Sequence, residues 1–421
     1  LYRSPDARTM RLGSLTGFDR RIWILAAGRV ISATGYSIVM PFLAIHLNSD
    51  MGISMVQVGL IYVVMAVAGA FGQIIGGEIA DRTGRRPVMW ASMVLRGLVF
   101  IGLFAVMIMA KEIWTISGLL VVSSLLGSMF DPASNAMVAD LVSVNRRMEA
   151  YSLLRVGQNI GWTLGPLISG IMIAFLPFSY LFAVASVTCL TVGAVVLLKV
   201  AEPLRSTASH AKFHLRDMAT IAHNRLFLMF CIASMPVGIV MGQMTSTFSV
   251  FAVQDAGIFE AEVGYLYALN GVMVVALQFP MARMISRYPM PSSLALGSLL
   301  YAVGYLFLGF SGAIWVLVLS MVVTTLGENV ISPSSTALVA KLSPDSERGR
   351  YMGAFGIFSS FGWSLGPAIG GSLYDSMHTA PLALWGSVAM IAMISVVMYL
   401  HLGKMSAEVE KSASRAEGAK G

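Results

Sequence analysis

The chain has 421 residues, of which 57% are hydrophobic and only 12% are charged, with a formal net charge of +7. Ordinary globular proteins carry about 25% charged residues, so this composition and a mean hydropathy of +0.77 exclude a water-soluble domain and indicate lipid as the main solvent. The basic residues are spread over separate loops, which argues against nucleic-acid binding, and the two cysteines, Cys189 and Cys231, support neither a disulfide framework nor a metal site.

Twelve apolar windows along the chain are long enough to cross a bilayer, which takes about 20 helical residues each. Their length and their Leu, Val, Met and Ala content exclude a β-barrel, whose strands have about ten residues of alternating polarity. The sequence therefore predicts an all-α integral membrane protein with twelve transmembrane helices. The predicted spans are 22–47, 57–79, 88–110, 114–139, 150–175, 178–199, 226–251, 262–285, 293–311, 313–339, 350–374 and 380–402.

Lys and Arg residues indicate how these spans are oriented. They are concentrated before the first span and in the even-numbered loops, whereas the odd-numbered loops hold a single base, Lys111. Because basic loops stay in the cytoplasm, we expect a multi-pass protein of the inner (cytoplasmic) membrane with both termini cytoplasmic. The first 20 residues are polar and basic without an apolar core, so we expect no cleaved signal peptide.

Two pairs of segments show an internal repeat. "DPASNAMVADL" resembles "SPSSTALVAKL", and "GWTLGPLISG" resembles "GWSLGPAIGG"; both pairs are 201 residues apart, as Pro132 and Pro333 show. An even number of spans separates the copies, so the two halves run parallel. The predicted organisation is an N-terminal six-helix half at 1–200, a cytoplasmic linker at 201–225, a C-terminal six-helix half at 226–403 and a disordered cytoplasmic tail at 404–421.

Parallel halves of this kind place a binding site near the bilayer midplane between them, as in transporters that work by alternating access. We therefore expect a small-molecule substrate, and a monomer, because the site forms between two halves of one chain.

The stretch "GGEIADRTGRRPVM" concentrates charge between spans two and three. Gly84 permits a tight turn, Pro87 suits the first turn of span three, and an acid is not needed as a topology signal. The stretch resembles the signature loop of the major facilitator superfamily, and that resemblance implies a latch between the halves. The second half has Ala282 in place of the acid, so we expect a lopsided latch, although the charges also serve topology and helix capping. The predicted gating residues are Gly77, Asp81, Arg82, Gly84, Arg85 and Arg86.

Span five carries glycines at every fourth position, a spacing that favours close helix contact. "RVGQNIGWTLGPLISG" resembles the span-five signature of the superfamily's drug/proton antiporters, which implies antiport, although helix packing alone explains the spacing and the motif recurs in span eleven. The family's further signature, an Arg in span four, is missing here. The residues of the motif are Gly157, Gly161, Gly165, Pro166 and Gly170.

Ionisable residues within a span are costly and therefore functional candidates. Glu328, in the middle of span ten, is our first choice for proton coupling; the alternative is a structural carboxylate. Asp131 and Arg155 lie at similar depth in spans four and five and are expected to form a buried pair, either for proton exchange or as a fixed salt bridge. Arg29 and Arg96 are expected to extend towards the cytoplasmic surface.

Uncharged polar residues in several spans are candidates for the wall of a substrate cavity, although some of them serve only to join helices. The 29 methionines also suit a promiscuous apolar pocket, but methionine is equally common facing lipid. The cavity candidates are Tyr36, Asn159, Gln243, Asn270, Gln278 and Asn329.

The combined pattern predicts a secondary active transporter that exports lipophilic or cationic compounds in exchange for protons. The proton gradient is the energy source, and no cofactor or metal is expected. The alternatives are a lysophospholipid or other small-metabolite carrier of the same fold and, from another class, a membrane receptor. Motifs of zinc proteases, nucleophile elbows and phosphate-binding loops are lacking, so the sequence does not predict an enzyme.

Overall fold

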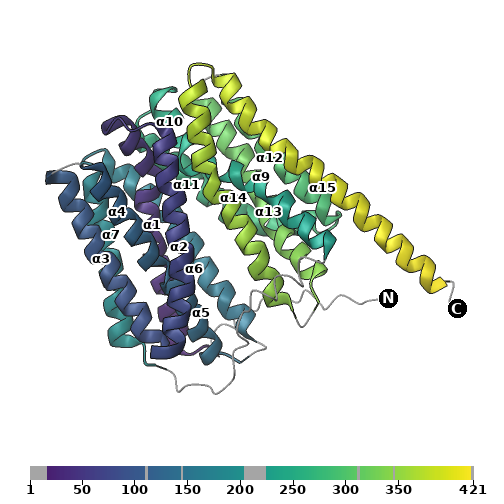
Figure 1. Ribbon diagram of the computed structural model, residues 1–421, viewed down its shortest axis with the longest axis horizontal. Helices are drawn as coiled ribbons and strands as arrows, with labels where there is room; N and C mark the ends of the chain where they lie inside the picture. The colour runs from purple at the N-terminus through teal and green to yellow at the C-terminus, as the bar shows by residue number, and fades with distance from the viewer. Residues whose placement is uncertain are drawn as a thin grey trace. The chain divides into compact units, whose positions relative to one another are not determined.

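The computed structural model describes residues 17–109, 112–143, 146–202, 224–310, 313–344 and 347–418. Most of the predicted linker, 201–225, and the predicted loop base Lys111 lie outside these ranges. The described residues form long α-helices joined by short connections, and no strand is found among them (Figure 1).

The first six predicted spans correspond to helices between Arg20 and Lys199. Span four is divided in two at Met129. Its second part begins just before Pro132, whose missing N–H and bulky ring disturb the turn that precedes it. The helices are α1 (Arg20–Ile45), α2 (Met55–Thr83), α3 (Arg85–Met109), α4 (Ile113–Ser128), α5 (Phe130–Leu141), α6 (Arg147–Ile173) and α7 (Ser179–Lys199).

The last six predicted spans correspond to helices from Arg225 onward. Span seven is interrupted by a short 3-10 segment, η4 (Gln243–Thr245). In the first half, a π-helical turn, η2 (His46–Asp50), follows α1. The helices are α9 (Arg225–Gly242), α10 (Thr247–Gln254), α11 (Glu260–Ile285), α12 (Met290–Phe307), α13 (Ile314–Leu342), α14 (Arg348–Met377) and α15 (Pro381–Gly418).

The C-terminal tail differs from the prediction. A disordered segment is expected from residue 404, but α15 continues to Gly418. The tail sequence "KMSAEVEKSASRAEG" is rich in Ala, Glu and Lys, which have high helix propensity, so the last helix can continue past the apolar segment.

Ten helical segments are long and apolar enough to cross a membrane, judged over the described part of the chain. The two other long helices, α6 and α14, contain the repeated glycine-rich motif and more polar residues. On α2, large apolar side chains are exposed along one stripe at Leu60, Val64, Val67, Phe71 and Ile74. A water-soluble protein does not expose such a stripe, so the chain is a multi-pass membrane protein.

The contacts between residues divide the chain into two compact units. Unit 1 contains Leu1–Tyr36, Ala68–Trp162 and Phe182–Ala208; unit 2 contains Ser37–Val67, Thr163–Leu181 and Ser209–Gly421. These boundaries are not those of the sequence repeat, so the predicted halves remain a prediction. In unit 1, α3 packs against α4 and α5; in unit 2, α12 lies between α13 and α15, and α14 packs against α9 (Figure 1).

Candidate functional site

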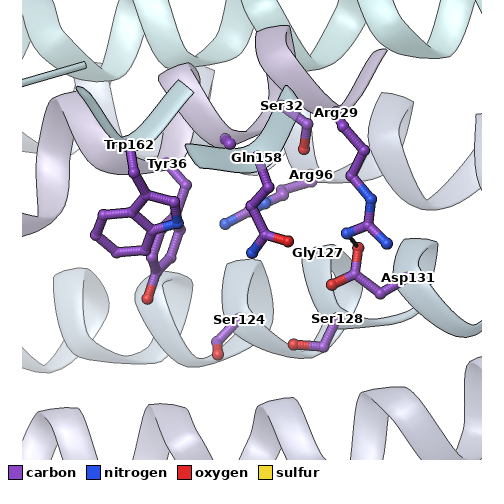
Figure 2. A pocket seen from close by; sticks show the side chains of 11 residues that line it. Arg29, Ser32, Tyr36, Arg96, Ser124, Gly127, Ser128, Asp131, Gln158 and Trp162 are labelled. Atoms are coloured by element: carbon purple, nitrogen blue, oxygen red, sulfur yellow. Dashed lines mark hydrogen bonds and ion pairs between the residues drawn. The ribbon is translucent and has the colours of Figure 1, made fainter. Parts of the chain in front are cut away.

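A pocket in unit 1 brings together three of the charged residues within the spans. Arg29 of α1, Arg96 of α3 and Asp131 of α5 all line it, and Figure 2 shows their side chains pointing into the same space. Ser32, Ser124, Ser128 and Gln158 add polar groups, while Tyr36 and Trp162 form an aromatic wall. The two aromatic rings meet edge to face, with centroids 5.6 Å apart.

The carboxylate of Asp131 is paired with Arg29. The Arg29 guanidinium donates to Asp131 Oδ1 and, over 3.3 Å, to Asn135 Oδ1. The Arg29 side chain is 9% exposed and that of Asp131 is 46% exposed, because the carboxylate faces the pocket (Figure 2). The predicted partner of Asp131, Arg155, has an exposed side chain on α6, so the expected Asp131–Arg155 pair is replaced by a pair with α1.

Arg96 is buried, with 5% of its surface exposed. Its guanidinium carbon lies 5.3 Å from the ring centroid of Tyr36 and 5.2 Å from that of Phe100, and its Nε has no hydrogen-bond partner. The guanidinium also rests on Gly127 of α4, where a Cβ atom would come within 2.4 Å of the guanidinium carbon. The sequence predicted that Arg29 and Arg96 extend towards the cytoplasmic surface. This prediction is wrong, because both side chains are directed inward.

Glu328 defines a second cluster, in unit 2. Its Oε2 accepts a hydrogen bond of 3.0 Å from Asn270 Nδ2 of α11, and the same amide group donates to Thr325 Oγ1 over 3.0 Å. The Thr325 hydroxyl donates in turn to the carbonyl of Met321 over 2.6 Å. Within the described residues no base forms an ion pair with Glu328, so its charge is met only by neutral groups. Tyr301 of α12 packs against the neighbouring Gly327.

The remaining cavity candidates differ in their surroundings. Gln243 is fully buried, and its amide donates to the carbonyls of Ile239 and Gly366 over 3.0 and 2.9 Å, so it joins η4 to α14. Asn329 is also buried and donates to the carbonyl of Thr325 one turn earlier. Asn159 and Gln278 are half-buried and line neither of the pockets described here. A second pocket lies between α9 and α14; its lining is Gly238, Met241, Ser359, Ser360 and Trp363.

The charged loop between α2 and α3 forms a compact network in unit 1. Gly84 has a φ of +110°, which other residues rarely adopt, so the predicted tight turn is present. Arg85 is buried and forms two ion pairs, one with Asp81 at 2.6 Å and one with Asp140 of α5 at 3.3 Å. Arg82 pairs with Glu78 one turn earlier.

Glu202, which sequence reasoning missed, caps the start of α3. Its two carboxylate oxygens accept the backbone N–H groups of Arg85 and Arg86, each over 2.7 Å. The guanidinium of Arg86 donates to the carbonyl of Leu197 in α7. A carboxylate at a helix N-terminus is favourable, but no local pattern indicates a cap that comes from 117 residues away. Gly77 lies next to Pro132.

The glycines of the span-five motif allow α6 to pack closely on its neighbours. In unit 1, a Cβ at Gly157 would lie 2.7 Å from the carbonyl of Ala26, and one at Gly161 would lie 2.5 Å from the Cβ of Ala33. In unit 2, Gly165 contacts Ser37, and Gly170 meets Gly264 of α11, near the carbonyl of Pro166. These contacts give the glycine spacing a packing role, while its link to antiport remains a prediction.

Among the described residues, no group of three or more His, Cys, Asp and Glu side chains is placed to hold a metal ion. The two clusters described above consist of charged and hydrogen-bonding side chains on apolar helices. A bundle of apolar helices with ionisable residues inside it is typical of the class of polytopic transport proteins.

The sequence profile of the Major Facilitator Superfamily matches residues 25–258 and again residues 237–420. The chain belongs to this superfamily, and it is a transporter of that fold. The predicted fold class and the predicted family are both confirmed by the repeated match.

The curated relatives span nearly the whole chain at low identity. The chain is 26% identical over 406 residues to the uncharacterized MFS-type transporter YqjV of Bacillus subtilis, covering 94% of this chain and 97% of that one. It is 27% identical over 392 residues to the multidrug resistance protein MdtH of Cronobacter sakazakii, covering 90% and 92%. It is 24% identical to a Na(+), Li(+), K(+)/H(+) antiporter of Planococcus maritimus, covering 83% and 88%.

Solved structures support the fold alone, because their sequence identities are low. The nucleoside transporter NupG is matched with a TM-score of 0.76 at 14% identity, over 92% of this chain and 99% of that one. A bacterial homologue of the human lysosomal transporter Spinster, in an inward-facing and unoccupied conformation, is matched with a TM-score of 0.75 at 12% identity, over 91% and 96%.

Proposed function

We propose that this transporter exports lipophilic or cationic compounds in exchange for protons, by alternating access, across the inner (cytoplasmic) membrane with both termini in the cytoplasm. The observation that carries the proposal is Glu328, a carboxylate in the middle of an apolar helix that has no basic partner among the described residues. Its hydrogen bond from Asn270 satisfies one oxygen but supplies no charge.

A carboxylate in such surroundings is costly unless something compensates its charge. A proton and a cationic group on a substrate are two alternatives, and one carboxylate cannot be fully compensated by both at once. Binding of one therefore favours release of the other, which is the thermodynamic requirement for exchange. This argument makes Glu328 the coupling residue and Asn270 the group that orients it; Asp131, with Arg29, is the second candidate, and we assign Arg155 no coupling role.

The names of two relatives agree with this proposal: one is called a multidrug resistance protein and another a cation/proton antiporter. At about 25% identity these names suggest exchange of this kind without defining the substrate. We also propose that the charged loop between α2 and α3, with Asp81 and Arg85, takes part in gating. Its ion pairs join α2, α3 and α5 through Asp81, Arg85 and Asp140.

A second candidate function is a carrier of lysophospholipids or other small metabolites. The observation that favours it is the pocket in unit 1, where two arginines face one acid. A pocket with surplus positive charge is not suited to a cationic group, so a substrate that enters it has different chemistry there. The receptor alternative has no specific support.

The test uses purified protein in liposomes with an internal pH dye and an imposed proton gradient. A panel of lipophilic cations is added to the wild type, to Glu328→Gln and to the control Glu347→Gln. Glu347 is an acid outside the membrane helices, at the start of α14, so its loss leaves the coupling chemistry intact. We expect a subset of the cations to release protons through the wild type and the control but not through Glu328→Gln.

If Glu328→Gln exchanges protons as the wild type does, the assignment of Glu328 is wrong, and Asp131→Asn is the next variant. If no compound moves protons through the wild type, while a tracer substrate is still transported down its own gradient, the chain is a carrier that is not coupled to protons. Ligand binding with no flux of any kind would favour a receptor.

A further inference from the structure

The pocket in unit 1 has a surplus positive charge that the proton exchange proposed for Glu328 does not use. It is lined by two guanidinium groups and one carboxylate. The carboxylate of Asp131 is taken up by Arg29 through their ion pair. Arg96 is left as a second cation, with 5% of its surface exposed.

Arg96 forms no hydrogen bond or ion pair with another described residue. Its contacts are the faces of two aromatic rings and the backbone of Gly127. Nε is buried without an acceptor, and Figure 2 shows the side chain directed into the pocket beside Gln158. A guanidinium has only donors, and among the described residues Nε of Arg96 has no acceptor; a ligand in the pocket can supply acceptors to this side chain.

The position of Arg96 depends on a gap in the neighbouring helix. A side chain at residue 127 would collide with the guanidinium, because an added Cβ would lie 2.4 Å from its carbon and 2.5 Å from one terminal nitrogen. Gly127 therefore lets the guanidinium pass over α4 and reach the pocket. The position of the Arg96 side chain therefore depends on a specific neighbour, Gly127, on the adjacent helix.

The other groups around the pocket are consistent with an anionic ligand. The Ser128 hydroxyl and the side-chain amide of Gln158, which both line the pocket, can each donate a hydrogen bond to an oxyanion. Guanidinium binds carboxylate and phosphate through two parallel hydrogen bonds. Next to these donors, Tyr36 and Trp162 offer apolar surface (Figure 2). The combination suits a negatively charged head attached to an apolar or aromatic body.

We propose that this pocket binds the oxyanion, a carboxylate or a phosphate, of an amphipathic substrate, and that Arg96 is the residue that receives it. The compounds that use this pocket are then anionic or zwitterionic amphiphiles, because its surplus positive charge repels a purely cationic group. The proposal rests on the proposed function only in taking the bound compound to be the transported one. Binding measured without a proton gradient tests the site whether or not protons drive transport.

The experiment measures binding to full-length protein in maltoside micelles by fluorescence polarisation. Three probes with the same dansyl body are compared: dansylglycine, its uncharged amide, and the phosphate monoester of dansyl-ethanolamine. The variants are Arg96→Gln, Arg96→Lys, Gly127→Ala and the control Glu347→Gln. Arg96→Lys keeps the positive charge but removes the planar guanidinium that can donate two parallel hydrogen bonds. Gly127→Ala keeps Arg96, but the added Cβ displaces its guanidinium. Thermal unfolding of each variant shows that it is folded.

We expect the wild type and the control to bind an anionic probe roughly tenfold or more tightly than the amide, as charge-assisted hydrogen bonds require. Arg96→Gln should lose this preference, and Arg96→Lys and Gly127→Ala should retain part of it. A stronger preference for dansylglycine identifies a carboxylate substrate, and one for the phosphate identifies a phosphate substrate. Equal binding of all three probes to the wild type, or an unchanged preference in folded Arg96→Gln and Gly127→Ala, overturns the proposal.

Discussion

The two copies of the repeated helix place their charge differently. Gly127 in the first copy and Glu328 in the second are 201 residues apart and occupy the same position of the repeat; Asp131 corresponds to Ser332 in the same way. In the first copy, this position has no side chain, because it is Gly127, and the guanidinium of Arg96 from α3 lies across it. In the second copy, it holds the carboxylate itself. The same helix geometry thus supports a cationic pocket in one unit and an acidic site in the other.

The two copies also differ in backbone. α13 runs unbroken through Pro333, whereas the helix that contains Pro132 is divided at Met129. Glycine lowers helix stability by about 1 kcal/mol relative to alanine, while glutamate is a good helix former. Gly127 and Pro132 together therefore lower the helix stability of the first copy near Met129, whereas Glu328 favours a continuous helix in the second copy.

The largest expected effect comes from the acid of the second copy. Glu328→Gln should abolish substrate-driven proton movement, because an amide cannot exchange a proton. The neutral hydrogen bond with Asn270 can be kept by the glutamine, so the free energy of unfolding should change by less than about 1 kcal/mol. Proton flux in liposomes and thermal unfolding of the same preparation measure the two effects. A large loss of stability would instead make Glu328 a structural group.

For Asp131, the acid of the first copy, we expect the larger effect on stability. Asp131→Asn leaves the buried guanidinium of Arg29 without its counter-charge, and breaking a buried ion pair costs about 3–5 kcal/mol. We expect about 3 kcal/mol, because the Asp131 side chain is 46% exposed and water in the pocket reduces the cost. Unfolding in detergent measures it. The double variant with Arg29→Gln, which removes both charges, should recover most of the loss; if it does not, the pair is not what stabilises the site.

The repeated glycine helices offer a third comparison. Gly161→Ala in α6 forces a Cβ to within 2.5 Å of Ala33, and such overpacking costs about 1–3 kcal/mol. Gly353→Ala in α14 meets nothing within 4 Å and should raise stability by up to about 1 kcal/mol. Thermal unfolding of the two variants side by side is the measurement. Equal effects of the two substitutions would contradict the packing assigned to the span-five motif.

The smallest expected effect concerns the starts of two equivalent helices. Glu202 caps α3 with two hydrogen bonds to backbone N–H groups, whereas the side chain of Pro289 gives α12 no cap. Glu202→Gln should cost about 1 kcal/mol and increase hydrogen exchange at the first amides of α3, while those of α12 are unchanged. Unaltered exchange at Arg85 and Arg86 would show that the cap is not formed in the membrane.

The sequence by itself determined the features that depend on local composition or on a repeat. The apolar windows locate the spans, because each bilayer crossing needs about 20 apolar residues. The repeat of 201 residues predicts two parallel halves, and Gly84 marks the turn, because only glycine adopts its conformation without cost. Glu328 is also visible as a candidate, since an acid within a span stands out wherever it points.

Only the tertiary structure decided which of these residues meet. Asp131 pairs with Arg29 instead of Arg155, Arg96 turns inward across Gly127, and Glu202 reaches α3 from far along the chain. These partners lie on different helices, and their contact depends on how each helix is rotated about its axis. That rotation is set by packing of small residues between helices, which depends on all the neighbours of a helix at once and cannot be derived from any one segment of the sequence.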